Sequence, residues 1–319
     1  MSRNIMSNYS QKHIMQLSII TINYNNAEGL RKTLASVASQ TYASIQHVIV
    51  DGSSSDASKD IIIDYAEHTK NPNHEIIWVS EKDKGIYNAM NKGIRMATGE
   101  YIEILNSGDI LAADDVTERM FQAMGNGQWA IDNETNRLIA SSPKQNCPAI
   151  LYGNMIKEYP DGRRVVDRCQ AKDYTPESFY YFYRGTLNHD CAYIRRDLFE
   201  KYGLYNEEMK ICSDWEWYVR AIVLGGEKTV YTNIDVTVFD MTGISESDGK
   251  SRDIILKERR EYLESILPAA VLRDYDMFSL PIEQYRRLKK YNLWGVVYFV
   301  ERVLFKFEKW GNKLKRKYQ

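Results

Sequence analysis

Short apolar runs alternate with longer amphipathic segments over the first part of the chain. The runs have the β-branched composition of buried strands, and they cover residues 17–22, 47–50, 76–79 and 101–105. The amphipathic segments have helical periodicity, and they cover residues 28–40, 57–68 and 86–97. Strands that alternate with helices form right-handed crossovers, which favour parallel pairing. We therefore predict an α/β fold with a Rossmann-like, mainly parallel sheet flanked by helices.

The pattern becomes mixed after residue 115. Pro160, Asp161 and Gly162 form a turn signal between two strand-like runs, which predicts a β-hairpin. Strand-like runs follow at 191–195 and 228–238, and helical segments at 196–202, 214–223 and 253–266. We predict an N-terminal tail at 1–16, one domain at 17–245 with halves 17–115 and 116–245, and a C-terminal helical extension at 246–319.

Composition and charge exclude several classes of protein. The 319 residues are 44% hydrophobic and 27% charged, as in ordinary globular proteins, and 42 Lys and Arg balance 43 Asp and Glu, so no overall field attracts nucleic acid. The four cysteines form no CxxC pair, which favours reduced thiols over a zinc site. The chain shows no signal-peptide pattern and no apolar stretch of about 20 residues, so we expect a cytoplasmic protein.

Acidic residues follow the predicted strands. Asp51, Asp83 and Asp109 come just after the second, third and fourth strands. Open α/β sheets bind ligands beyond the carboxyl ends of their strands, so these carboxylates are expected to converge on a nucleotide and metal site. The simpler alternatives are an Asx turn at Asp51 and a helix cap at Asp109. Neither GxGxxG after the first strand nor GxxxxGK[ST] occurs, which argues against dinucleotide dehydrogenases and P-loop enzymes.

Four segments together resemble family 2 glycosyltransferases of the GT-A fold. They are SIITINYN at 18–25, VIVDGSSSD at 48–56, the run 83–109, and the later pair HDCAYIRRDLFEKYG and SDWEWYVRA. The resemblance covers about residues 17–240 and implies a nucleotide-sugar half at 17–115 and an acceptor half at 116–245. In this family a nucleotide diphospho-sugar lies across the strand ends, and its sugar passes to an acceptor hydroxyl with inversion at the anomeric carbon.

The resemblance also implies a set of donor-site residues. Tyr24 would flank the base, Asp51 would hydrogen-bond uracil, and Asp83, Lys84 and Asn91 would line the site. The expected donor is therefore a UDP-sugar. Lys84 is equally well explained as a solvated lysine at the start of a helix.

The metal motif of the family is reduced in this chain. It is an acidic cluster after the fourth strand, and its counterpart here is residues 106–109, with Asp109 as the one carboxylate. A single carboxylate, phosphate oxygens and waters can still hold Mn²⁺ or Mg²⁺. The ion would neutralise the charge that develops on the departing nucleoside diphosphate.

The resemblance assigns the catalytic base to Asp214, which would begin a helix and remain ionised there. Ser213 replaces the acid that precedes the base in the family. The simpler alternative is a capping box with Ser213 as N-cap and Glu216 at the third helical position. His189 resembles a family position near the acceptor, although a lone loop histidine can also be structural.

The last 27 residues form an amphipathic, basic pattern. An apolar stripe with several aromatic residues runs from Leu293, and its polar side carries mainly Lys and Arg. This character fits a helix in a membrane interface, which would hold the protein on the inner face of the cell membrane beside a lipid-linked acceptor. Docking on the catalytic domain, or pairing in a dimer, would also explain the stripe.

The sequence thus predicts an inverting, metal-dependent glycosyltransferase that moves a sugar from a nucleotide sugar to a glycan or lipid-linked acceptor in cell-surface polysaccharide biosynthesis. A non-catalytic sugar-nucleotide-binding scaffold is an alternative, because Gly108 and Ser213 replace acids of the family motifs. A sugar-phosphate nucleotidyltransferase is disfavoured, since no Gly-rich basic loop follows the first strand.

Overall fold

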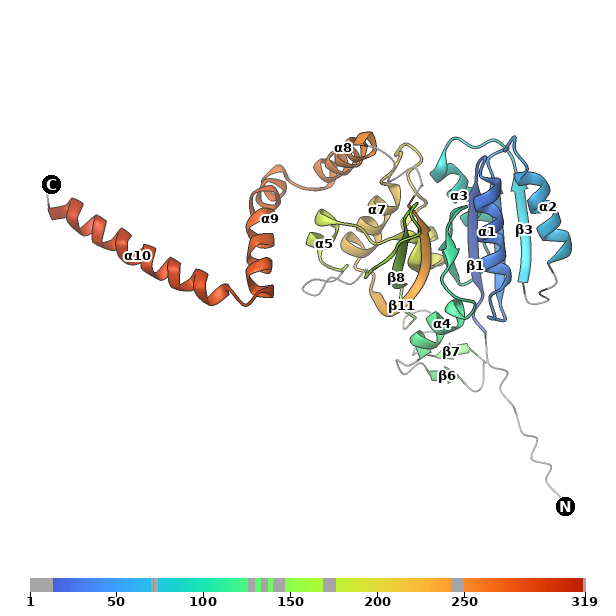
Figure 1. Cartoon of the computed structure of the whole chain (residues 1–319), viewed down its shortest axis with the longest axis horizontal. Coiled ribbons are helices and arrows are strands. Elements are labelled where there is room, and N and C mark those ends of the chain that lie inside the picture. The colour runs from blue at the N-terminus through green and yellow to red at the C-terminus, as the bar shows by residue number, and fades with distance from the viewer. Residues whose placement is uncertain are drawn as a thin grey trace, which may run out of the picture. The chain divides into compact units, whose positions relative to one another are not determined.

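The computed structural model describes residues 14–69, 71, 74–125, 130–132, 137–139, 147–168, 176–241 and 249–317. The chain divides into two compact units, Met1–Glu258 and Arg259–Gln319. The first unit contains the sheet and its flanking helices, and the second contains the last helices (Figure 1).

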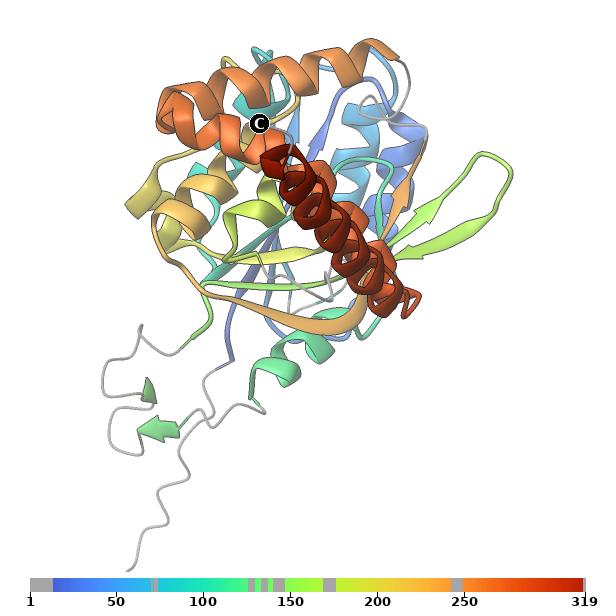
Figure 2. The same cartoon turned by 90° about the vertical axis from the view of Figure 1, so that its left-hand side faces the viewer.

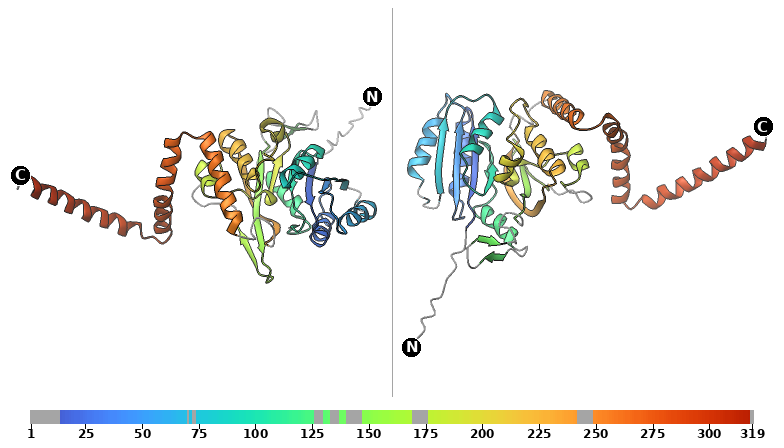
Figure 3. Two further views of the ribbon diagram at one scale, coloured as in Figure 1. Left: turned by 90° about the horizontal axis from the view of Figure 1, so that it is seen from above. Right: turned by 180° about the vertical axis from the view of Figure 1, so that it is seen from behind.

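The N-terminal half is the predicted α/β unit. Its elements are β1 (Leu17–Asn23), α1 (Ala27–Ala38), β2 (Ile45–Asp51), α2 (Ser58–His68), β3 (His74–Ser80), α3 (Ile86–Met96) and β4 (Tyr101–Ile104). The four strands pair in parallel in the order β3-β2-β1-β4. The chain thus steps outward from β1 to β3 and then crosses back to place β4 on the other side of β1. Right-handed crossovers put α1 and α2 on one face and α3 on the other, as the view from above shows (Figure 3).

The second half extends the same sheet with mixed pairing. β10 (Ala192–Arg195) joins β4 antiparallel, followed by β8 (Ile150–Glu158), β11 (Thr229–Asp240) and β5 (Ile110–Leu111). β8 and β11 are parallel, and β9 (Arg164–Asp167) forms the predicted hairpin with β8, which projects from the sheet in Figure 2. A separate two-stranded sheet contains β6 (Ala130–Asp132) and β7 (Arg137–Ile139). Parallel pairing is therefore concentrated in the N-terminal half.

The remaining helices of the first unit surround the second half of the sheet. They are α4 (Val116–Gly125), α5 (Phe179–Arg184), the 3₁₀ turn η1 (His189–Cys191), α6 (Asp197–Tyr202) and α7 (Ser213–Tyr218). α7 continues into the π-helical turn η2 (Val219–Leu224). The helix predicted at 214–223 is therefore confirmed, and its second half is π-helical. The buried rings of Trp217 and Phe199 stack with centroids 4.6 Å apart and fill the space beneath α7.

The core of the N-terminal half is formed around its apolar strands. Every residue of β1 and β2 is buried, because helices cover both faces of these central strands. Leu30 and Leu34 of α1 pack with Ile49 of β2 and Ile62 of α2 in one cluster. This packing fixes the strand ends, from which the polar loops start.

The C-terminal helices are α8 (Gly249–Ile266), α9 (Ala269–Lys290) and α10 (Trp294–Lys317). The division between the two compact units falls inside α8. α9 contains Pro281 and lies in the predicted helical extension, in a part for which the sequence pattern gave no helix bounds. Within the described ranges, none of the helices combines the length and the apolar character that crossing a bilayer requires.

Candidate functional site

The carboxyl ends of the parallel strands meet at one edge of the sheet. Asn23 at the end of β1 is in register with Asp51 at the end of β2, and Asp51 is in register with Ser80 at the end of β3. β4 pairs with the other side of β1, where the strand order reverses. Such a switch point is where open α/β sheets bind ligands. The strand ends thus place Asn23, Asp51 and Ser80 side by side at this edge.

Asp51 is fully buried and accepts four hydrogen bonds from the protein. Its Oδ1 accepts from Asn23 Nδ2 at 2.8 Å and from Ser54 Oγ at 2.5 Å, and its Oδ2 accepts from Ser54 N at 3.0 Å and Ser80 Oγ at 2.7 Å. Burial favours the neutral form, but these hydrogen bonds outweigh it and lower the pKa of Asp51. The carboxylate thus holds the turn at residues 52–54 through Ser54, three positions on, rather than through an Asx turn, and a contact with uracil stays a prediction.

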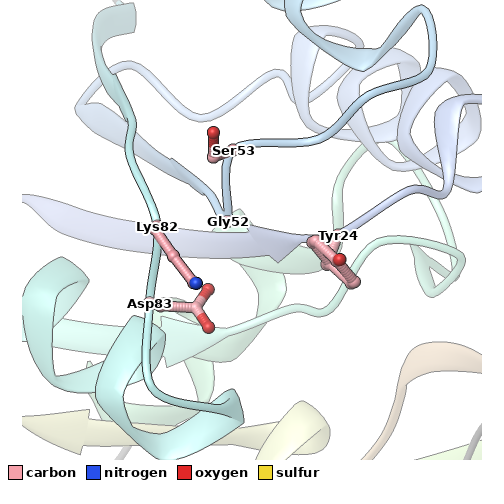
Figure 4. A pocket seen from close by; sticks show the side chains of 5 residues that line it. All are labelled: Tyr24, Gly52, Ser53, Lys82 and Asp83. Carbon is pink, nitrogen blue, oxygen red and sulfur yellow. The ribbon is translucent and has the colours of Figure 1, made fainter.

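A pocket of about 200 Å³ opens beside this turn (Figure 4). Tyr24, Gly52, Ser53, Lys82 and Asp83 line it, and 67% of the Tyr24 side chain is exposed. A Cβ atom on Gly52 would lie 2.5 Å from Asp83 Oδ2, so a side chain at this position would displace the Asp83 carboxylate. The pocket offers an aromatic face, a carboxylate and a cation, which are groups that can hold a nucleotide.

Besides Asp51, two of the predicted donor-site residues do not line this pocket. Lys84 is exposed, and its backbone N–H donates to Asn88 Oδ1 at 3.1 Å. Asn91 is buried, and its amide binds the backbone of Tyr205 in both directions and Glu207 Oε1 at 2.9 Å. Lys82, which the sequence reasoning missed, lines the pocket in their place. Its position in the charged run EKDK gave no signal that separated it from Lys84.

The loop after β4 is held by α1. Asn26 Nδ2 donates to the carbonyl oxygen of Ser107 at 2.9 Å, and Thr33 Oγ1 donates to that of Asp109 at 2.7 Å. The N–H of Gly108 donates to Thr33 Oγ1 at 3.0 Å, and Gly108 has a φ of 113°, which a side chain would strain. Residues 106–109 therefore form a fixed turn at the same edge of the sheet.

Asp109 turns inward from this loop. It is 4% exposed, and its Oδ1 accepts from the N–H of Asp240 on β11 at 3.0 Å, so the helix cap offered as an alternative is not formed. Burial and the nearby Asp190 carboxylate raise the pKa of Asp109 to about 8. The buried Asp109 carboxyl therefore binds a proton more readily than a solvated aspartate does.

The loop has two oxygen atoms that suit a hard cation. One is Asn106 Oδ1, which is buried without a hydrogen-bond partner. The other is Asp109 Oδ2, the second oxygen of the carboxyl group whose Oδ1 accepts from Asp240 of β11. In the described part of the chain, no group of three His, Cys, Asp or Glu side chains is arranged to hold a metal. The loop fits Mn²⁺ or Mg²⁺ as a partial ligand set, which a diphosphate and water would complete.

His189 and Asp214 form a pair next to this loop. His189 Nδ1 lies 3.2 Å from Asp214 Oδ2, and His189 Nε2 lies 3.2 Å from Asn106 Nδ2. Burial favours neutral histidine, but the hydrogen bond to Asp214 and the charges of Asp214, Asp190 and Asp109 outweigh it and raise the pKa of His189 to about 9. The fold thus brings together the predicted base, acceptor residue and metal loop.

The start of α7 is stabilised differently from the prediction. The N-cap is Cys212, and Ser213 Oγ is buried without a hydrogen bond, so the capping box with Ser213 as N-cap is wrong. Glu258 of α8 accepts from the N–H groups of Lys210, Ile211 and Cys212 at 2.6–3.1 Å. A distant carboxylate therefore binds the free N–H groups before the helix, which a local motif cannot reveal.

Two buried acids beneath the pair were missed by the sequence reasoning. Glu103 of β4 is fully buried, and Asp190 is 2% exposed with its Oδ2 unpartnered. Burial and their mutual repulsion raise the pKa of Glu103 well above its usual value, and burial also raises that of Asp190. A glutamate inside the apolar run YIEIL was the available signal for Glu103.

Sequence comparison relates the chain to glycosyltransferases. Residues 18–133 match the model of the glycosyl transferase family 2. The PGL/p-HBAD biosynthesis glycosyltransferase of Mycobacterium tuberculosis is 27% identical over 245 residues, which are 76% of this chain and 81% of the relative. An uncharacterised glycosyltransferase of the same organism is 27% identical over 231 residues, which are 72% of this chain and 76% of the relative.

Structural comparison finds the same fold in TarS of Staphylococcus aureus. The complex of TarS 1–349 with UDP-GlcNAc superposes with a TM-score of 0.56 at 17% identity, over 80% of this chain and 69% of TarS 1–349. The complex with UDP gives a TM-score of 0.53 at 18% identity, over 71% of this chain and 60% of the other. At this identity the similarity concerns the fold.

Proposed function

Since this chain belongs to glycosyltransferase family 2 and has the GT-A fold, we propose that it transfers a sugar from a UDP-sugar to a hydroxyl group of a glycan or lipid-linked acceptor, with inversion, in cell-surface polysaccharide biosynthesis. The observation that carries the proposal is the chain of contacts from Asn106 through His189 to Asp214. It joins a loop suited to a diphosphate with a carboxylate suited to a base.

The pocket at Tyr24 supports a nucleotide donor. The exposed Tyr24 ring can stack on a base, and Asp83 can accept the N–H of uracil. Lys82 adds a positive charge beside the same pocket. Asp51 contributes indirectly, because its hydrogen bonds to Ser54 fix the turn at residues 52–54 that lines one side of the pocket.

Asp214 is the group best placed to take a proton from the acceptor. In the proposed step, the acceptor oxygen forms a bond to the anomeric carbon while Asp214 removes its proton. The bond to the diphosphate oxygen breaks on the opposite face, and the electron pair leaves with UDP. His189 lies beside Asp214 and can orient its carboxylate for this transfer.

Mn²⁺ or Mg²⁺ would be held by Asp109 and Asn106 and would supply charge neutralisation for the leaving diphosphate. The protein's own part is to keep the loop 106–109 fixed through Thr33 and Asn26.

The proposal is tested by release of UDP from a panel of UDP-sugars, with GDP- and dTDP-sugars for comparison, in Mn²⁺ and in EDTA. We expect one UDP-sugar to be turned over in Mn²⁺ and the rate to fall at least about 100-fold in EDTA, in Asp109→Ala and in Asp214→Asn. Asp115→Asn, at an exposed surface carboxylate, is the control and should leave the rate unchanged. If no nucleotide sugar binds, the proposal is wrong.

A non-catalytic scaffold is the second candidate, favoured by Gly108 and Ser213 in place of acids. The same experiment separates it from the enzyme. A scaffold would bind a UDP-sugar with unchanged affinity in Asp214→Asn and release no UDP, with or without an acceptor.

The second compact unit supports membrane attachment. On α10 the apolar side chains of Phe299, Leu304 and Phe307 are 58–67% exposed, and Lys306 and Lys309 are also exposed. Apolar and aromatic side chains beside lysines are typical of helices that lie in an anionic membrane interface. We therefore propose that α10 binds the inner face of the cell membrane, where a lipid-linked acceptor would be available.

A further inference from the structure

One face of α3 connects the donor pocket to the segment before α7. Asn88 Nδ2 donates to Glu207 Oε2 at 2.7 Å, and Asn91 binds Tyr205 and Glu207 one turn later. These positions follow each other at helical spacing, so they lie on one side of α3. The donor half and the acceptor half are therefore joined along this face by hydrogen bonds.

Tyr87 occupies the N-terminal end of the same face. Its hydroxyl oxygen lies 2.5 Å from the carbonyl oxygen of Ile211 and 3.2 Å from Asp214 Oδ1. The side chain is 5% exposed, and its ring packs against that of Tyr205 with centroids 5.7 Å apart. Asp214 is thus contacted on one oxygen by Tyr87 and on the other by His189.

The pocket segment leads directly into Tyr87. Lys82 and Asp83 line the pocket, and Asp83 Oδ1 accepts the N–H of Gly85 at 3.0 Å. α3 begins at Ile86, so Tyr87 lies four positions after the pocket carboxylate. A short, hydrogen-bonded segment thus connects the pocket to Tyr87.

We propose that Tyr87 is a positioning residue for Asp214, which holds the carboxylate toward the acceptor and links its orientation to the donor pocket through the start of α3. This inference rests on the proposed function, in which Asp214 is the base. The single proton of the Tyr87 hydroxyl is shared between the Ile211 carbonyl oxygen and Asp214 Oδ1, which ties this carboxylate oxygen to the segment before α7 and leaves the other oxygen to His189 and the acceptor.

A double-mutant cycle on UDP release from the UDP-sugar that wild type turns over tests this inference. Tyr87→Phe keeps the ring and removes the hydroxyl, and we expect kcat to fall about tenfold with the KM for the donor unchanged. In the Asp214→Asn background, the same change should lower kcat less than twofold, because its target is already lost. An equal loss in both backgrounds would overturn the inference in favour of a structural role for Tyr87.

Tyr205→Phe is the matched control. Tyr205 lies in the same aromatic contact, and its hydroxyl is buried without a hydrogen-bond partner, so its removal should leave kcat, KM and thermal stability at wild-type values. If Tyr205→Phe lowers kcat as much as Tyr87→Phe, the effect belongs to packing in the aromatic contact and the inference is wrong.

A readout without catalysis separates this inference from the proposed function. In protein labelled with ¹³C at the aspartate carboxyl groups, Tyr87→Phe should shift the NMR resonance of the Asp214 carboxyl carbon, which Asp214→Asn identifies by its loss, because the hydroxyl contact to Oδ1 is removed. Tyr205→Phe should leave this resonance unchanged. An unchanged Asp214 resonance in Tyr87→Phe overturns the inference, even if wild type turns over no UDP-sugar.

Discussion

His47 is a buried histidine that the fold keeps neutral. Its ring nitrogens lie 3.0 Å from Thr21 Oγ1 and 2.8 Å from Tyr65 Oη, and the side chain is fully buried in β2. Burial, together with the nearby His74, lowers its pKa to about 3. The unfolded chain therefore binds a proton at His47 at a pH where the folded chain does not.

This difference predicts an acid-dependent loss of stability. Because the folded pKa lies below the unfolded one, the contribution of His47 is present above pH 6.5 and is lost as the pH falls toward 3. Between pH 7 and pH 5 it should cost about 2 kcal/mol of the unfolding free energy. Urea unfolding of wild type and His47→Gln measures it as the difference in their pH slopes. His68→Gln, at an exposed histidine, should keep the wild-type slope.

Gly52 gives a second prediction at the residue scale. In Gly52→Ala the new methyl group would meet the Asp83 carboxylate and displace it into the pocket. We expect the affinity for UDP, measured by calorimetry, to fall at least about tenfold with little change in melting temperature. Gly185→Ala is the control, because its nearest neighbour would be 3.7 Å from the new atom. Wild-type affinity for UDP in Gly52→Ala would contradict the assignment of the pocket.

The strand-end pattern could place Asp83 at this edge, because strand ends in an α/β fold converge by topology, whereas Tyr24 came only from the family resemblance. It could not separate Lys82 from Lys84, since both are solvated lysines two positions apart, and only the course of the loop decides which one faces the pocket. Asn91 lies outside the pocket because the phase of α3 turns it toward Tyr205. Helix phase relative to a ligand depends on tertiary packing, which one sequence does not encode locally.

At the scale of elements, the start of α7 depends on α8. Glu258→Gln removes the charge that three backbone N–H groups share, and we expect a loss of about 1–2 kcal/mol in the free energy of unfolding of the first unit. Chemical denaturation followed by tryptophan fluorescence measures it, since Trp215 and Trp217 lie in α7. Asp253→Asn, at an exposed residue of the same helix, should have no effect. A similar loss in both variants would assign the effect to α8 itself.

Elements with a strong period were predictable and those without one were not. The alternation of apolar runs and amphipathic segments gave the parallel strands β1 to β4 within a few residues. The antiparallel insertion of β10 beside β4 was not predictable, because pairing order depends on contacts far apart in the chain. The bounds of α9 could not be predicted within the helical extension, because Pro281 interrupts the sequence pattern, although the helix continues through it.

At the scale of the whole molecule, we expect the first compact unit to bind UDP and the second to bind membrane. Deletion of residues 259–319 should leave binding of UDP to the first unit within about twofold of wild type, because the pocket residues all lie before Glu258. The full chain should float with vesicles that contain anionic lipid, and the shortened chain should remain in the soluble fraction. Flotation of both chains alike would place membrane binding outside α9 and α10.

One consequence concerns how substrates reach the site. The sheet runs without interruption from β3 to β5, and the face of α3 is bonded to the segment before α7. A hinge motion between residues 17–115 and residues 116–245 would have to break the backbone pairing between β4 and β10. It would also have to break the hydrogen bonds from α3 to Glu207. Opening of the two halves is therefore an unfavourable way for substrates to enter the site. Substrate exchange should instead depend on movements of side chains and short loops at the carboxyl ends of the parallel strands.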